Sequence, residues 1–357
     1  MKISKLKLAS GVVVAATAST ANAQSSVTLY GIADAAITFS SKTASASGGN
    51  AGKSFAVADG GGGPSLFGML GVEDLGSGLK AEFRLESGIN VANGGFNSSN
   101  GNFFGRQAWV GLDGDFGAVK AGLQRSPFFI ALYESDPRNY SGFASALLLY
   151  AENVAVTGAF NSNAVTYTSP KLAGFQGQAM LALGGSAGDF SAGRQWSGSL
   201  KYENGPLMMN AAIYDGNSGG TVQTPVPSTV AFEGRTMGAG YTFGSLTFKA
   251  SFVNYKVAHS FNSNIYGGGV DFRLTPSVEL NGGVWYTTDR DDTVNHSVLA
   301  AVGASYHLSP RTSLYAQIGT VNNHGAMRTG LSVTDTSLLR GTPGTSIGGD
   351  IGIRHSF

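Results

Sequence analysis

The sequence contains no cysteine, and charged residues make up only 13% of the chain. The first absence excludes a disulfide framework, a thiol nucleophile and any metal site built on cysteine. A charged share roughly half that of an ordinary soluble domain leaves too little ionic surface for a protein surrounded by water. The stability of this chain must therefore come from backbone pairing and burial.

Long apolar runs are also missing. A membrane-spanning helix needs about 20 consecutive apolar residues, and the longest candidate after the N-terminal segment, Ala144 to Ala151, is interrupted by Ser145 and Tyr150. A bilayer permits only helices and closed barrels as spanning structures, because every backbone polar group must be paired inside the protein. The composition therefore favours an all-β transmembrane barrel.

The first 23 residues have the three features of an export signal: a positive start, a short apolar stretch and a small-x-small cleavage site. We therefore expect residues 1–23 to be a cleaved leader and residues 24–357 to form one barrel domain. Without the leader's three lysines the chain has 20 basic and 22 acidic groups, which gives no reason to expect a nucleic-acid partner. The three features are Lys2, Lys5 and Lys7, then Leu8–Ala18, then Ala21-Asn22-Ala23.

Apolar residues alternate with smaller or more polar ones along several segments. A period of two over about ten residues is typical of transmembrane strands with one lipid-facing and one lumen-facing side. The clearest apolar sets are Val298, Ala300, Val302, Ala304 and Tyr306, then Leu314, Ala316 and Ile318, then Ile347, Gly349, Ile351, Ile353, His355 and Phe357.

Seven short connections rich in turn-forming residues alternate with eight long ones, which is the number that joins sixteen antiparallel strands. Short turns facing the periplasm and long loops facing outside are typical of outer-membrane barrels, and sixteen strands enclose an aqueous lumen. The short connections are Gly76–Gly78, Gly114–Gly117, Pro170–Gly174, Asn204–Pro206, Gly244–Ser245, Thr275–Ser277 and Ser309–Arg311. The long ones are Ser41–Gly63, Ala92–Asn102, Ser126–Phe160, Gly185–Gly193, Asn217–Glu233, Ala258–Asn264, Asp289–Asn295 and Asn322–Gly344.

Six stretches, in order along the chain, resemble the Gram-negative trimeric porins, in particular the general porins of β-proteobacteria. They are Ser26–Gly31, Gly71–Ala81, Phe104–Leu112, Val165–Pro170, Tyr306–Ala316 and Gly352–Phe357. The resemblance implies a homotrimer in the outer membrane, in contact with its lipid and lipopolysaccharide, with each sixteen-stranded barrel narrowed by an inward third long loop, here Ser126–Phe160. It also implies that the terminal Phe357 acts as the assembly signal for membrane insertion.

Members of this family usually place basic side chains on the wall opposite acidic residues of the inward loop. Alignment puts Ile32, Leu66, Leu123 and Phe160 at such wall positions here, with Arg106 and Arg125 as the nearest basic residues. We therefore expect an unusually apolar constriction that leans weakly towards cations and passes small hydrophilic or amphipathic solutes and ions. The alternative is a substrate-specific channel with a saturable site for a neutral or aromatic small molecule.

The inward loop itself is apolar at 128–132 and 146–150, and its charged residues are Glu134, Asp136, Arg138 and Glu152. Two interpretations remain open. The apolar side chains either pack the loop onto the barrel wall, since a loop of this length needs anchoring, or line an apolar eyelet.

No catalytic, metal or cofactor site is expected. Gly-x-Ser-x-Gly occurs at 184–188, 216–220 and 344–348, but with 53 glycines in 357 residues the match carries little weight, and no strand-to-helix elbow is predicted there. The five histidines have no metal-ligand spacing. Asp289, Asp291 and Asp292 lack the ligand pattern of a calcium loop, so a solvated acidic loop is the favoured interpretation. Gly60–Gly63 is expected to be a flexible loop.

Overall fold

A computed structural model describes residues 26–154, 159–221 and 230–357. The expected leader, 1–23, lies outside the described residues. No helix in the described part of the chain is long and apolar enough to cross a membrane.

The strands are β1 (Ser26–Ala44), β2 (Asn50–Asp59), β3 (Leu66–Gly76), β4 (Leu79–Gly88), β5 (Gln107–Gly114), β6 (Gly117–Arg125), β7 (Phe160–Thr168), β8 (Phe175–Ala182), β9 (Gln195–Asn204), β10 (Leu207–Gly216), β11 (Phe232–Phe243), β12 (Leu246–Val257), β13 (Asn262–Thr275), β14 (Val278–Asp289), β15 (His296–Ser309), β16 (Thr312–His324) and β17 (Gly344–Ser356). The helices are α1 (Pro127–Ser135), α2 (Ala146–Val154) and α3 (Thr336–Leu339).

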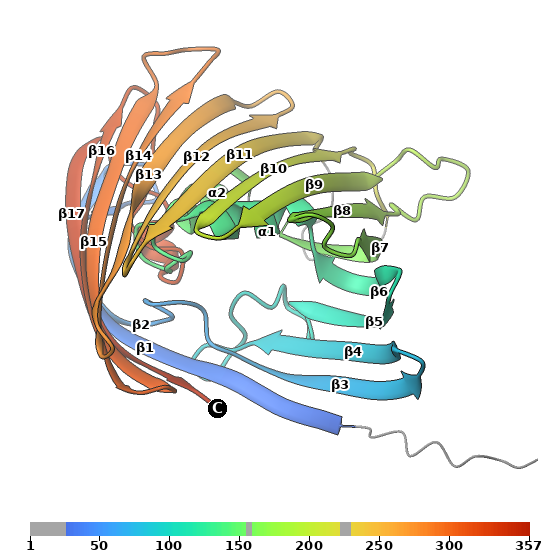
Figure 1. Cartoon of the computed structure of the whole chain (residues 1–357). Coiled ribbons are helices and arrows are strands. Elements are labelled where there is room, and N and C mark those ends of the chain that lie inside the picture. The colour runs from blue at the N-terminus through green and yellow to red at the C-terminus, as the bar shows by residue number, and fades with distance from the viewer. Residues whose placement is uncertain (1–25, 155–158, 222–229) are drawn as a thin grey trace, which may run out of the picture.

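The strands form one closed antiparallel barrel (Figure 1). From β3 to β17 each strand pairs with the next in sequence, and β1 pairs with both β17 and β3, which closes the ring. β2 pairs with the second half of β1 and β3 with the first half, so these two segments share one place in the wall. The seventeen strands of the described residues therefore make a sixteen-stranded barrel, as predicted.

The two faces of each strand differ as the alternation predicts. On β10, Met209 and Ile213 point outward and are 49% and 43% exposed, whereas Asn210 and Tyr214 point into the lumen and are buried. The apolar sets of β15, β16 and β17 also lie on the outer face, where Val302, Ile318 and Ile351 are exposed. An apolar outer band and a more polar inner face suit a barrel in lipid.

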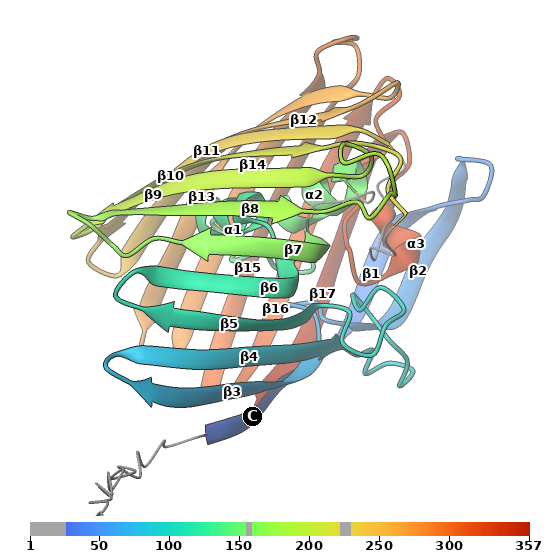
Figure 2. The same ribbon diagram turned by 90° about the vertical axis from the view of Figure 1, so that its right-hand side faces the viewer.

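All seven predicted short turns are confirmed, and they gather at one end of the barrel (Figure 2). The first long loop was predicted wrongly. Most of Ser41–Gly63 is a hairpin, because β1 extends to Ala44 and β2 begins at Asn50. The reason is that Phe55 and Val57 alternate with small or polar residues among many Ser, Gly and Ala residues, which hid the strand pattern.

The predicted flexible segment Gly60–Gly63 instead interrupts the wall between β2 and β3 and lies against the lumen. The hydroxyl of Ser141 donates to the carbonyl oxygen of Gly61 at 2.9 Å, and the side-chain amide of Gln317 donates to the same oxygen at 2.9 Å. The segment therefore connects the barrel wall to the inward loop.

The last residue closes the seam of the barrel. Phe357 and Gly31 exchange two backbone hydrogen bonds of 3.0 and 3.1 Å. A Cβ added to Gly31 would lie 2.3 Å from the ring of Phe357, so only glycine leaves room for the ring here. The terminal phenylalanine is thus part of the pairing between the last strand and β1. Its role as an assembly signal stays a prediction.

Candidate constriction site

The described part of the inward loop, residues 126–154, enters the barrel and carries α1 and α2 inside it (Figures 1 and 2). Helix α1 begins where Ser126 caps it, accepting a hydrogen bond of 3.1 Å from the backbone N–H of Phe129, and where Pro127 supplies a fixed φ. The backbone N–H of Phe128 donates to the hydroxyl of Ser197 on the inner face of β9. The start of α1 is thus fixed to the wall.

Two glycines of β11 let α1 approach the wall closely. A Cβ on Gly234 would lie 2.6 Å from the ring of Phe128, and one on Gly238 would lie 1.8 Å from the hydroxyl of Ser135. The same end of α1 is held by Asn210, whose amide donates to the carbonyl oxygen of Ala131 at 3.0 Å. The helix therefore docks on β9–β11 because Gly234 and Gly238 leave space for its side chains and because Asn210 forms a hydrogen bond to its backbone.

The apolar side chains of the loop form a core inside the barrel. Phe128 is fully buried and meets Tyr255 edge to face, with ring centroids 6.2 Å apart. Packing of the loop onto the wall is therefore the correct interpretation for most of these residues, and an eyelet lined by them is not. The buried loop members are Phe128, Phe129, Ala131, Leu132, Leu148, Leu149 and Tyr150, and their wall partners include Tyr214, Phe232, Val253, Tyr255, Trp285, Leu299 and Val321.

Two of the predicted charged loop residues stabilise the loop itself. Asp136 is 1% exposed and accepts hydrogen bonds from the backbone N–H groups of Arg138, Tyr140 and Ala146. Burial nevertheless raises its pKa above the ordinary aspartate value. Arg138 is equally buried and donates to Asn281 and to two loop carbonyl oxygens. Neither side chain is exposed enough to set the electric field in the water of the lumen.

The other two loop carboxylates lie at different places. Glu134 forms an ion pair of 2.8 Å with Lys201 on β9. Glu152 on α2 is half-buried near Thr329 and Arg340, and burial raises its pKa to about 8. The four predicted loop residues are thus not gathered at one constriction.

The residues predicted to form an apolar wall do not all share one face of the barrel. Ile32 and Leu66 are direct register partners on β1 and β3, on the same lumen face as Tyr30. Leu123 is opposite Ala108, which shares the outer face of β5 with the exposed Val110. Leu123 therefore faces lipid, because the alternation of β6 turns it away from the lumen.

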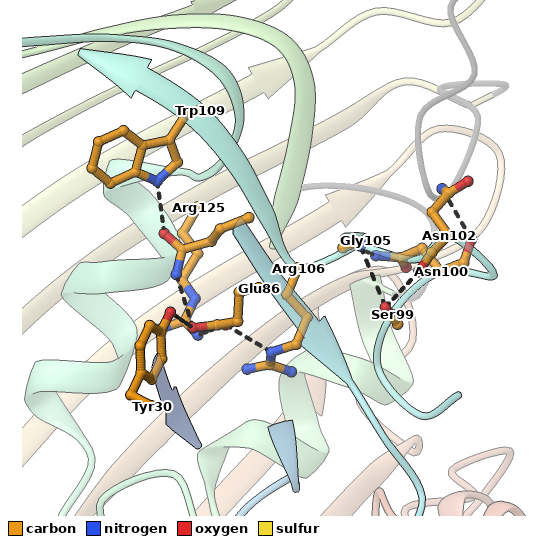
Figure 3. Close-up of polar contacts among 10 residues, drawn as sticks. Tyr30, Glu86, Ser99, Asn100, Asn102, Gly105, Arg106, Trp109 and Arg125 are labelled. Atoms are coloured by element: carbon orange, nitrogen blue, oxygen red, sulfur yellow. Dashed lines mark hydrogen bonds and ion pairs between the residues drawn. The ribbon is translucent and has the colours of Figure 1, made fainter. Parts of the chain in front are cut away.

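The largest omission from the sequence-based site is Glu86, which lies at the centre of a buried polar cluster (Figure 3). Its carboxylate accepts hydrogen bonds from Arg106 at 2.8 Å, from Tyr30 at 2.9 Å and from Arg125 at 3.3 Å. The side chains of Glu86 and Arg106 are 4% and 5% exposed. This arrangement neutralises much of the charge of the two predicted arginines.

Two further basic residues line the same wall and were also missed. The guanidinium of Arg84 lies 6.0 Å from the ring centroid of Trp109, and the ammonium of Lys120 lies 4.1 Å from the same ring. Neither forms an ion pair within 4.0 Å among the described residues. A signal was available, because Lys80, Glu82, Arg84 and Glu86 alternate with Ala81, Phe83 and Leu85 along one strand. We call Arg84, Glu86, Arg106, Lys120 and Arg125 the charged wall.

Phe160 lies where the charged wall meets the inward loop. Its ring centroid is 5.4 Å from the guanidinium of Arg106 and 6.4 Å from the ring of Phe129. Phe160 therefore adds an apolar ring to this region, as expected. The ring lies beside a basic side chain, so the region is not purely apolar.

The described residues hold no cluster of three or more histidine or acidic side chains suited to a metal ion. His296 and His324 stack with ring centroids 4.4 Å apart at the long-loop end of β15 and β16. In the acidic loop, Asp289 and Asp292 accept hydrogen bonds from nearby backbone N–H groups, as turn residues do.

Comparisons with known proteins agree with this architecture. A family model described as Gram-negative porin matches residues 9–326. Outer membrane porin protein 32 of Delftia acidovorans is 29% identical, with 100% of both chains covered. An outer membrane porin protein of Bordetella pertussis is 28% identical, with 99% of this chain and 100% of that protein covered. A solved structure described as an anion-selective porin from Comamonas acidovorans has a TM-score of 0.81 at 26% identity, covering 94% of this chain and 100% of that one.

Proposed function

Because the chain belongs to the Gram-negative porin family, we propose that it forms a passive, water-filled outer-membrane channel for small hydrophilic or amphipathic solutes and ions. The observation that carries the proposal is a closed barrel whose lumen is narrowed by the inward loop, with α1 packed on β9–β12. Its relatives are porins, which are channels and not enzymes.

Charge on the side of the lumen formed by β4–β6 favours a weak preference for anions. The charged wall carries four basic side chains, Arg84, Arg106, Lys120 and Arg125, against Glu86 and the neighbouring Glu82. The expected cation lean assumed that the wall lacks the basic ladder usual in the family, so we replace it here. The anion-selective description of the Comamonas acidovorans neighbour agrees with this direction.

Ile32 and Leu66 add an apolar strip beside this wall, which suits amphipathic solutes. The alternative, a saturable site for a neutral or aromatic molecule, would make such a solute interrupt the ion current at low concentration. The homotrimer in this proposal is supported by the family resemblance, and a mass measurement in mild detergent tests it.

Reconstitution of the purified protein in planar bilayers tests the channel and its selectivity together. We expect stepwise increases in conductance and a zero-current potential of the sign for anion preference in a potassium chloride gradient. Folded protein that inserts without conductance steps would refute the channel, and a strongly cation-selective potential would refute the assigned role of the charged wall.

A further inference from the structure

A polar cavity lies away from the charged wall. It has a volume of about 230 Å³ and is enclosed by the inner faces of β14–β17, the tip of the inward loop and Gly62. The short turn at Pro310 and Arg311 borders it, so the cavity is at the short-turn end of the barrel. None of the charged-wall residues lines it.

Strand register explains why a hollow forms here. Ser313 on β16 pairs with His307 on β15 on one side and with Arg354 on β17 on the other. In the next row, Ser305 and Gly352 flank Tyr315 in the same way. Side chains of paired residues point to one face, so small residues among long ones leave space between the long side chains.

Charged groups around the cavity are only loosely paired. Arg354 Nη1 is 3.7 Å from Asp34 Oδ2, and that oxygen is buried without a hydrogen-bond partner among the described residues. His307 Nε2 is likewise buried without one, at 3.5 Å from Glu279 Oε2. The separation between Arg354 and Asp34 exceeds hydrogen-bonding distance, so donor capacity of Arg354 remains for a ligand.

The roof of the cavity is held in place by the wall. Arg138 Nε donates to Asn281 at 3.0 Å, and the hydroxyl of Ser141 lies 2.8 Å from the side-chain oxygen of Gln317. Because these contacts fix the roof without any ligand, binding would cost little additional ordering of the protein.

We propose that this cavity binds a small organic carboxylate that has passed the constriction. Arg354 and the hydroxyl of Ser313 would hold the carboxylate, and Glu279 would disfavour larger polyanions. The choice of a carboxylate follows from the excess of donors over the single lining carboxylate Glu279. The inference rests on the proposed function because solutes reach the cavity through the channel.

Single-channel recordings test the site with succinate as probe and succinamide, its neutral analogue, as control, at low salt to limit screening. We expect succinate added on the short-turn side to cause brief, concentration-dependent interruptions and succinamide to cause none. Interruptions by both, by sulfate equally well, or by neither would overturn the carboxylate site. Absence of any conductance would instead contradict the channel itself.

Two variants locate the site. Ser313→Val fills the floor without changing charge, and Arg354→Gln removes the main donor, so each should shorten the interruptions about tenfold, as expected for loss of a charge-assisted hydrogen bond. Ser199→Val is the matched control on the lumen face of β9, across the barrel, and should behave as the wild type does. If Ser313→Val conducts normally and keeps wild-type interruptions by succinate, the site is wrongly placed, whatever the effect of Arg354→Gln on folding.

Discussion

The two sides of the lumen differ in what fills them. Against β9–β16 the inward loop forms an apolar core, with Phe128 and Leu148 fully buried. Against β4–β6 the wall keeps Arg84 and Lys120 beside Trp109, and a buried ion pair between Glu86 and Arg106. The interior of this barrel is therefore a protein core on one side and a polar passage on the other.

The difference follows from what each side must satisfy. An apolar contact needs only shape, so Phe128 can fill the space left by Gly234. A buried charge needs partners within hydrogen-bonding distance, and Glu86 finds three. The charged wall should therefore be more sensitive to a single substitution than the packed side.

The largest effect is expected for Glu86→Gln. Breaking a buried ion pair by removing one partner costs about 3–5 kcal/mol, because Arg106 is left as an uncompensated buried charge. We expect a lower unfolding temperature in detergent and a shift of the zero-current potential towards anions. Glu82→Gln, on the same face of β4, should move the potential without a comparable loss of stability. Equal stability of the two variants would show that Glu86 is not the centre of this cluster.

Phe128→Ala tests the packed side. Truncation of a buried phenylalanine typically costs about 3–5 kcal/mol, but here part of the loss is local, because the barrel hydrogen bonds remain. We expect frequent current fluctuations as α1 loosens, with little change in selectivity. Phe248→Ala, on the outer face of β12, should leave the fluctuations unchanged. If the Phe128→Ala channel showed no additional current fluctuations, the loop would be anchored by other residues.

Leu66→Arg should change selectivity by a smaller amount. A new cation on the lumen face beside Ile32 adds Coulomb energy of the order of 1 kcal/mol at an effective dielectric near 20 and raises anion preference severalfold. The matched change Leu123→Arg places the charge on the outer face, so insertion should suffer while the zero-current potential stays as in the wild type. A shift of the potential by Leu123→Arg would contradict the register of β5 and β6.

The smallest effect concerns pH and Glu152. Burial raises the pKa of this carboxyl to about 8 from an ordinary value of 4.5, so the folded loop favours the neutral form. The resulting stabilisation of α2 is fully present below about pH 4.5 and is lost as the pH rises through about 8. We expect loop fluctuations to increase as the pH rises from about 5 to 8 and Glu152→Gln to remove this dependence. An identical pH profile of the variant would assign the effect to another group.

Much of the fold could be predicted because its signals are local. Alternation in β15–β17 gave the outer face, and turn residues such as Asn204-Gly205-Pro206 gave the strand ends. β2 was missed because only Phe55 and Val57 mark its outer face. The candidate site was predicted less well. Ile32 and Leu66 were placed on the lumen wall, but Leu123 was not distinguishable from them by alignment alone.

The sequence by itself determined that this chain spans a membrane as a barrel, since composition, two-residue periodicity and turn chemistry are properties of short segments. Tertiary structure alone decided which distant side chains meet. Glu86 gathers Tyr30, Arg106 and Arg125, and Ser313 stands between His307 and Arg354, only because closure and register fix which residues face each other across neighbouring strands. Register is set by the whole ring of strands, and one residue of slip would turn each of these groups to the opposite face.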